Sequence, residues 1–163
     1  MMLEKLQITS KTLIIFFLTI SFSSAEILNP DSAISPKEVV SIQLSGLQKN
    51  DFKYKDSGIE QTWNFAHPNN KKVTGPLGKF KRMIKGASYQ MMIDHLSHTI
   101  TELGSSDKWA QFEVIILDKN KIYHKFNWQV EKYEVDGFVS RYGIVLLDLV
   151  NITAVSWKYS RIS

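Results

Sequence analysis

Cysteine is absent from this sequence of 163 residues. Its absence excludes disulfide bonds, thiolate metal sites, a lipoprotein anchor and a cysteine nucleophile. The chain also lacks the glycine-rich patterns that bind nucleotides, the G-x-S-x-G pattern of serine hydrolases and the H-E-x-x-H pattern of zinc proteases. It contains no internal repeat, no low-complexity segment and no interdomain linker. What remains is an ordinary globular composition that names no reaction.

The first 25 residues have the layout of a secretory signal peptide. Lys5 and Lys11 flank a polar start that precedes an apolar run at residues 13–20. Ser23 and Ala25 then place small side chains where a signal peptidase cleaves. We expect cleavage after Ala25 and export to the periplasm or another extracytoplasmic compartment, including the thylakoid lumen if the source is phototrophic. The alternative is an uncleaved membrane anchor, although the apolar run is short for a membrane span.

The mature chain is expected to carry a short tail, residues 26–34, and to form a single domain over residues 35–163. Apolar residues make up 44% of the sequence and charged residues 22%. These proportions are typical of a folded domain and argue against disorder. The net charge is mildly positive, so composition alone indicates no particular partner.

The first helix has a clear start signal. Ser35 supplies an N-cap, Pro36 occupies the first helical position, and Glu38 completes a capping box. Apolar residues at positions 40, 44 and 47 then share one helical face. We predict a helix that continues to about Asn50.

Two further helices are predicted. One is expected from about Ser57 until Pro68 stops it, since the residue before a proline avoids helical geometry. Residues 69–72 are expected to be a polar connection. The third helix follows Gly75 and ends near Gly86, with its apolar side chains on one face.

The second half of the chain is predicted to form antiparallel strands. Strands are expected at residues 91–93 and 97–103, and a long hairpin is expected over residues 109–131, where apolar and polar residues alternate. Residues 138–150 form either a buried strand or a helix, which periodicity alone does not distinguish. A last strand is expected at residues 152–159. Three helices followed by a curved antiparallel sheet give an α+β fold with the helices on one face.

The register of the hairpin follows from the parity of its apolar positions. Both strands place their apolar side chains on one face only if the numbers of paired residues add to an even sum. We predict a three-residue loop, residues 118–120, that Asn120 closes in the left-handed conformation. The expected cross-strand pairs are Val114 with His124, Phe112 with Phe126, and Ala110 with Trp128.

A pattern within residues 35–93 resembles a known family. It contains S-P-x-E-V-V at 35–40, D-S-G-I at 56–59, T-W-x-F-A-H-P at 62–68 and T-G-P-L at 74–77. It is similar to the small family known as domain of unknown function 4864, within the SnoaL-like, nuclear-transport-factor-2-like cone folds. The resemblance implies three helices packed on a strongly curved sheet. It implies no activity, because folds of this kind host enzymes and binding modules alike.

His124 is the sharpest candidate for chemistry, because it places an ionisable ring in the apolar row of the hairpin. Such a histidine can act as a general acid or base, and His98 would meet it as a polar pair if His98 also faces inward. The alternative is a core histidine satisfied by one hydrogen bond. The D-H-x-x-H cluster at residues 94–98 is not expected to bind a metal, because an extended segment points His95 and His98 to opposite faces. No cofactor is expected.

Side chains of the hairpin and the second helix suit an apolar ligand pocket, since such pockets are mostly aromatic and aliphatic. The expected lining residues are His124, Phe126, Trp128, Phe112, Val114 and Trp63. The simpler interpretation is that these side chains fill the core of a small domain.

Six basic residues lie within fifteen positions that contain no acid: Lys71, Lys72, Lys79, Lys81, Arg82 and Lys85. Such a patch attracts phosphate, anionic lipid headgroups or an acidic partner. Nucleic acid is not expected, because no base-reading motif accompanies the charges. The alternative is the solvated face of a helix.

These features favour a non-catalytic binding or interaction module with an apolar pocket for a hydrophobic or amphipathic ligand, or for a protein partner. The alternative function is a pocket enzyme that transfers protons, as isomerases and dehydratases do, through His124. A second polar group within hydrogen-bond reach of His124 is what the enzyme requires. The family resemblance also implies a homodimer through the outer face of the sheet.

Overall fold

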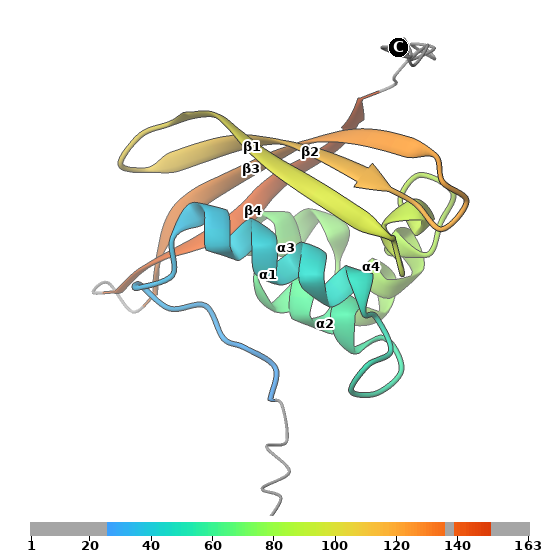
Figure 1. Ribbon diagram of the computed structural model, residues 1–163. Coiled ribbons are helices and arrows are strands. Elements are labelled where there is room, and N and C mark those ends of the chain that lie inside the picture. The colour runs from blue at the N-terminus through green and yellow to red at the C-terminus, as the bar shows by residue number, and fades with distance from the viewer. Residues whose placement is uncertain (1–25, 136–138, 151–163) are drawn as a thin grey trace, which may run out of the picture.

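The computed structural model describes residues 26–135 and 139–150 (Figure 1). Its elements are, in chain order, α1 (Pro36–Gln48), α2 (Ser57–Asn64), α3 (Pro68–Thr74), α4 (Leu77–Ile84), the 3-10 turn η1 (Gln90–Met92), β1 (Ser97–Ser105), β2 (Trp109–Leu117), β3 (Tyr123–Val135) and β4 (Val139–Val150). The fold class is α+β, with four α-helices in this part of the chain where three were expected. The expected signal peptide and the strand expected at residues 152–159 lie outside the described residues.

The described strands form one open antiparallel sheet with the order β1-β2-β3-β4. The helices lie on one face of this sheet (Figure 1), and α1 contacts all four strands. Fully buried apolar side chains from both layers make one core between them. Because apolar and polar residues alternate along β2, that strand presents one face to the core and the other outward.

Helix α1 begins at the capping box that the sequence predicts. The hydroxyl of Ser35 accepts from the backbone N–H of Glu38 at 3.3 Å, and the Glu38 carboxylate accepts from the backbone N–H of Ser35 at 2.8 Å. Val40, Leu44 and Leu47 are fully buried. Both the start and the inward face of this helix are confirmed.

Helices α1 and α2 approach each other at two glycines. A Cβ at Gly58 would lie 2.0 Å from the carbonyl oxygen of Gly46, so only glycine permits this contact. Asn50 holds the start of α2, because its carbonyl accepts from the N–H of Gly58 at 2.8 Å and from the hydroxyl of Ser57 at 2.9 Å. The amide oxygen of Asn50 also accepts from the N–H of Ile59 at 3.1 Å.

The expected polar connection at residues 69–72 is wrong, because these residues belong to α3. Pro68 follows α2, but it also occupies the first position of the next helix, where a missing N–H has no consequence. His67 caps that helix, since its Nδ1 accepts from the N–H of Asn69 at 3.0 Å. The helix expected third along the chain is therefore α4.

The expected strand at residues 91–93 is also wrong. Part of that segment forms η1, which buries Met92 against the core. Asp94, at a positive φ of 55°, then turns the chain into β1, whose start at residue 97 is confirmed. Residues 139–150, for which periodicity allowed a strand or a helix, form strand β4.

The hairpin of β2 and β3 has the predicted parity, but its register is shifted by two positions. His124 lies opposite Ile116 and not opposite Val114. The other observed pairs are Val114 with Phe126, Phe112 with Trp128, and Ala110 with Val130. The apolar side chains still share one face, because a shift of two preserves it.

Asp118 explains the shift, because it closes a longer loop than the one predicted. Its N–H donates to the carbonyl of Ile122 and its carbonyl accepts from the N–H of Lys121, both at 2.9 Å. Its carboxylate Oδ1 accepts from the N–H groups of Asn120 and Ile122, both at 2.8 Å. The left-handed residue is Lys121, with φ 63°, and not Asn120. A side chain therefore sets the length of this loop together with the backbone.

Candidate functional site

A pocket of about 460 Å³ opens beside the loop between β2 and β3. We call it the loop pocket. Met91 and Ile93 supply its apolar lining, and its polar lining comes from Lys85, Gln90, Asp118, Lys119, Asn120 and His124. Its volume lies within the range of pockets that hold small ligands.

His124 enters this pocket as one half of a pair with Asp118. The Nε2 atom of His124 lies 3.0 Å from Oδ2 of Asp118, whose side chain is almost completely buried. Burial acts to raise the pKa of Asp118, but hydrogen bonds from the Ile122 N–H, from the His124 ring and from the Asn120 N–H outweigh it. The pKa of Asp118 therefore lies below its ordinary value.

An ionised carboxylate only accepts hydrogen bonds, so Nε2 of His124 carries the proton that it donates to Asp118. In the neutral ring, Nδ1 is then an acceptor. Within the described residues, Nδ1 has no hydrogen-bond partner. Asp118 thus holds the histidine in one orientation, and the other ring nitrogen is not used by any residue that the structure describes.

His98 does not form the expected pair with His124. Both lie directly opposite Ile116 on neighbouring strands, so they share the inner face but flank a fully buried side chain. His98 instead bonds to His95, with 2.7 Å between its Nδ1 and Nε2 of His95. The prediction that His95 and His98 point to opposite faces is wrong, because His95 precedes β1 and follows the turn at Asp94.

His98 and His95 form a chain of hydrogen bonds that ends at the carbonyl of Met92. Nδ1 of His95 lies 2.7 Å from the carbonyl oxygen of Met92, which can only accept, so this nitrogen donates. Nε2 of a neutral His95 then accepts from Nδ1 of His98. Burial lowers the pKa of both rings, although the Met92 carbonyl and Asp94 act in the opposite direction on His95. Among the described residues, no three His, Cys, Asp or Glu side chains gather to hold a metal ion.

Four of the residues expected to line an apolar pocket are fully buried in the core: Phe112, Val114, Phe126 and Trp128. The fifth, Trp63, packs its ring against Phe80 with a centroid distance of 5.3 Å. The ammonium of Lys71 lies 5.4 Å from the Trp63 ring. Of the expected lining residues, only His124 borders the loop pocket.

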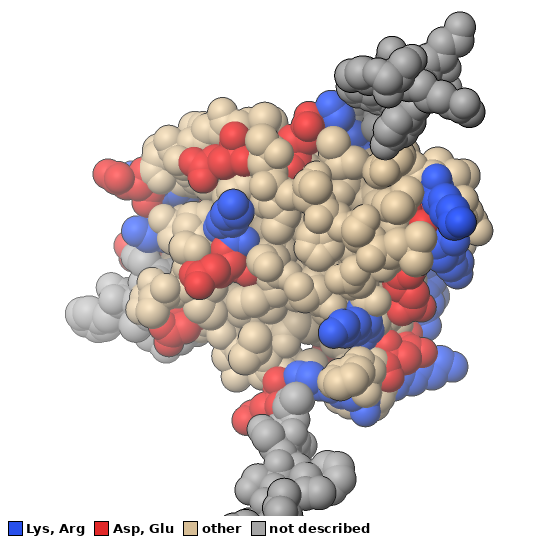
Figure 2. Space-filling model, viewed as in Figure 1, with Lys and Arg blue, Asp and Glu red and all other residues tan. Residues whose placement is uncertain are grey.

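The six expected patch residues do not form one free basic surface. Lys81 pairs with Glu60 at 3.6 Å and Lys85 pairs with Asp56 at 2.7 Å. Lys71 donates to the carbonyl of Asn64 at 3.1 Å. The remaining three are exposed and form no ion pair with any residue that the structure describes: Lys72, Lys79 and Arg82. On the face shown in Figure 2, basic and acidic side chains are intermixed.

Asp118 is a site residue that the sequence does not single out, because the pattern around it predicts only a turn. The spacing carries a signal: Asp118 begins the hairpin loop and His124 is the second residue of the strand that follows it. A hairpin brings the ends of its loop together, so an acid and a histidine there are expected to meet.

No family model, curated protein or solved structure matches the chain. The function of the site is therefore inferred from its geometry. Among the helices in residues 26–135 and 139–150, none is long and apolar enough to cross a bilayer.

Proposed function

We propose that the protein is a non-catalytic binding module whose small amphipathic ligand occupies the loop pocket. The observation that carries this proposal is the pocket itself, which sets apolar Met91 and Ile93 beside the hydrogen-bonding ring of His124. A site with an apolar surface and a few fixed polar groups is the usual form of a small-molecule site. Because Asp118 fixes the orientation of His124, the polar side of the site is preorganised.

The charges around the loop pocket favour an anionic head group. The Asp118 carboxylate already accepts from two backbone N–H groups and from His124, so it offers little to a ligand. Two lysines line the pocket. Lys85 shares its ammonium with Asp56, whereas Lys119 is exposed and forms no ion pair within the described residues. A carboxylate or phosphate with an apolar body therefore matches the site.

Calorimetric titration with decanoate tests this function, with decanol and decyltrimethylammonium as neutral and cationic comparators. We expect decanoate to bind the full-length chain at least about tenfold more tightly than decanol, because one charge-assisted hydrogen bond contributes about that factor. Lys119→Glu should weaken decanoate binding by a similar factor. Lys121→Glu is the matched control, since Lys121 is exposed in the same loop and does not line the pocket. Equal binding of the anion and the cation would contradict the proposal.

A second function, proton transfer, is supported by one specific observation. The His124–Asp118 pair has the arrangement of a general base held by a carboxylate. If the protein acts in this way, protons next to the ketone of a bound ligand such as 4-oxodecanoate will exchange with deuterium in D₂O faster than without the protein. Proton NMR should show exchange with the unmodified chain and none with His124→Gln. Binding without exchange would support the non-catalytic module.

We also propose that the fold is a nuclear-transport-factor-2-like cone of the family that the sequence resembles, which the layered α+β arrangement supports. Export with cleavage after Ala25 is supported by the composition of residues 1–25, and N-terminal sequencing of the exported chain tests it. A homodimer through the outer face of the sheet is supported by the family resemblance alone. Analytical ultracentrifugation tests it, and a monomer at micromolar concentration would contradict it.

A further inference from the structure

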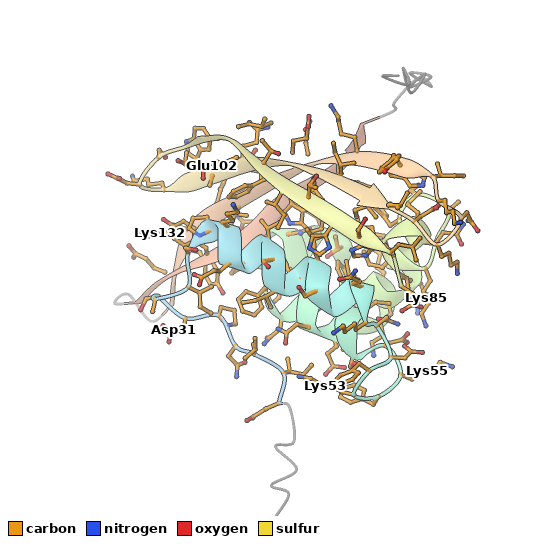
Figure 3. All side chains as sticks on the ribbon, viewed as in Figure 1. Asp31, Lys53, Lys55, Lys85, Glu102 and Lys132 are labelled. Carbon is orange, nitrogen blue, oxygen red and sulfur yellow. The ribbon has the colours of Figure 1, made fainter. Side chains whose placement is uncertain are left out.

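A second site, separate from the loop pocket, lies on the side of the helices away from the sheet. Residues 26–29 form neither helix nor strand, yet side chains hold their main chain. The ammonium of Lys53 donates to the carbonyl of Glu26 at 2.6 Å, and the amide of Asn64 donates to the carbonyl of Leu28 at 2.6 Å. Figure 3 labels Lys53, which lies at the start of this run, and Asp31, which follows the run before α1. Contacts of this kind recognise a backbone.

Gln61 makes the most specific of these contacts. Its Nε2 donates to the carbonyl of Leu28 at 2.9 Å, and its Oε1 accepts from the N–H of Leu28 at 2.8 Å. These are the two hydrogen bonds that a neighbouring β-strand offers to one residue of an extended peptide. The Gln61 side chain is buried, with 6% of its residue surface exposed, so its amide is fixed in place. The clamp does not depend on the side chain at position 28.

An apolar groove of about 290 Å³ lies beside the clamp. Ile42 and Gly46 of α1 line it together with Phe52, and Ile27 and Leu28 border it from the segment itself. Phe52 is 76% exposed and Leu28 is 53% exposed. The resident segment therefore leaves much of this apolar surface open to solvent.

The charges around the groove match the resident segment. Lys49 and Lys53 both line the groove, and the segment carries the acidic Glu26 immediately before the apolar Ile27 and Leu28. Lys53 contacts Glu26 through its main-chain carbonyl, so the acid side chain matches the two lysines by the sign of its charge. An extended segment with an acid before two apolar residues therefore suits the charge of the site, the groove and the main-chain clamp together.

We propose that this groove is a peptide-binding site. The partner that we propose is an extended segment of another protein, in which an acidic residue precedes two apolar residues. In the structure, residues 26–29 of the same chain occupy the site. Main-chain recognition by Gln61 and Asn64 serves any segment of that pattern. A partner must displace the resident segment, which competes at a high effective concentration because it is tethered.

The test uses a fluorescent peptide with the sequence of residues 26–30, Glu-Ile-Leu-Asn-Pro, and the full-length chain. Leu28→Pro removes the N–H that donates to Gln61 and should release the resident segment, while the residues of α1 and α2 that line the groove stay unchanged. Leu28→Ala is the matched control, because it keeps that N–H. We expect the peptide to bind the Leu28→Pro chain at least about tenfold more tightly than the unmodified chain. The Leu28→Ala chain should stay within about threefold of the unmodified chain.

A second peptide locates the binding. Methylation of the leucine nitrogen in the peptide removes the donor for Gln61 and should weaken binding to the Leu28→Pro chain by about tenfold. Gln61→Glu should weaken the unmethylated peptide similarly, since a carboxylate cannot donate to the leucine carbonyl. Equal affinity for the Leu28→Pro and unmodified chains, no binding to either, or indifference to the methyl group would each overturn the proposal. None of these outcomes affects the loop pocket, which these residues do not line.

Discussion

Two histidines, His98 and His124, flank Ile116 on the same face of the sheet and differ in everything around them. His98 bonds to His95, which bonds in turn to the carbonyl of Met92. His124 bonds to one buried carboxylate, that of Asp118, and borders a pocket. The first pair uses its polar groups to close the junction between η1 and β1. The second holds one polar ring at the border of the loop pocket.

The difference shows that position in a strand does not decide what a histidine does. Both rings occupy inward positions of the same alternating pattern. What separates them is the partner that each loop supplies: a second imidazole before β1, and a carboxylate after β2. An imidazole partner favours neutral rings in a buried site, whereas a carboxylate fixes a tautomer and frees the opposite nitrogen.

Of the changes considered for the two histidine sites, removal of the Asp118 carboxylate should lower the free energy of unfolding the most. Asp118→Ala takes the acceptor away from two backbone N–H groups and from His124. We expect it to lower the free energy of unfolding by about 2–3 kcal/mol, because each group loses its partner. Urea unfolding of Asp118→Asn is the control, since the amide oxygen still accepts from the backbone, and its cost should be about 1 kcal/mol. Equal costs for the two variants would show that the loop does not depend on this carboxylate.

Disruption of the His95–His98 pair should lower the free energy of unfolding by a smaller amount. His95→Phe removes the donor to the Met92 carbonyl and the acceptor for His98. Because the ring is buried and phenylalanine fills similar space, we expect a loss of about 1–2 kcal/mol in the free energy of unfolding. Decanoate affinity should not change. A loss of ligand binding in this variant would mean that the two histidine sites are coupled.

The pH dependence of stability should separate the two sites further. The pKa values of His95 and His98 are lowered in the folded chain. The folded chain therefore binds protons at these two rings less tightly than the unfolded chain does. Their contribution is therefore present above about pH 6.5 and is lost as the pH falls through the lowered values. The lowered pKa of Asp118 has the same sign at lower pH, so its contribution is present above about pH 4 and is lost below it.

Urea midpoints measured from pH 8 to pH 3 check these two ranges. The unmodified chain should lose stability in both ranges. The double variant with His95→Phe and His98→Phe should lose less stability than the unmodified chain in the upper range, where His67, whose pKa is also lowered by burial, still contributes. It should keep the lower loss. A double variant that loses as much stability as the unmodified chain between about pH 6.5 and pH 5 would assign that loss to another group, such as His67.

The sequence predicts the strands that carry the two histidines better than it predicts the contacts that the histidines make. The parity of β2 and β3 follows from alternation, because one buried face demands it. The exact register depends on the hydrogen bonds of Asp118, and a side-chain acceptor in a loop leaves no periodic signal. The pairing of His95 with His98 depends on where β1 begins and on the positive φ of Asp94. Neither can be read from spacing alone.

The helical layer teaches the same lesson. The capping box at Ser35 is local, so the start of α1 was predictable. A proline is compatible with either the end of one helix or the start of the next, so Pro68 does not by itself predict which. The structure shows that α3 begins at Pro68. The sequence predicts only a tail at residues 26–34, because the partners of residues 26–29 are distant along the chain: Lys53, Gln61 and Asn64.

The smallest effect is expected on the outer face of the same strand. Tyr123 lies next to His124 in β3 but is 63% exposed. Tyr123→Ala should change the free energy of unfolding by less than about 0.5 kcal/mol, as is usual for exposed positions. Urea unfolding measures this directly. A larger loss would show that the outer face of the sheet carries packing of its own.

Titration of decanoate into His124→Phe and His98→Phe tests the central claim most directly, because the two variants make the same change on either side of Ile116. We expect His124→Phe to weaken binding at least about tenfold, since the ligand loses its fixed hydrogen-bonding partner. His98→Phe should bind within about twofold of the unmodified chain. Unchanged binding in His124→Phe, or equal losses in both variants, would contradict the assignment of the loop pocket as the ligand site.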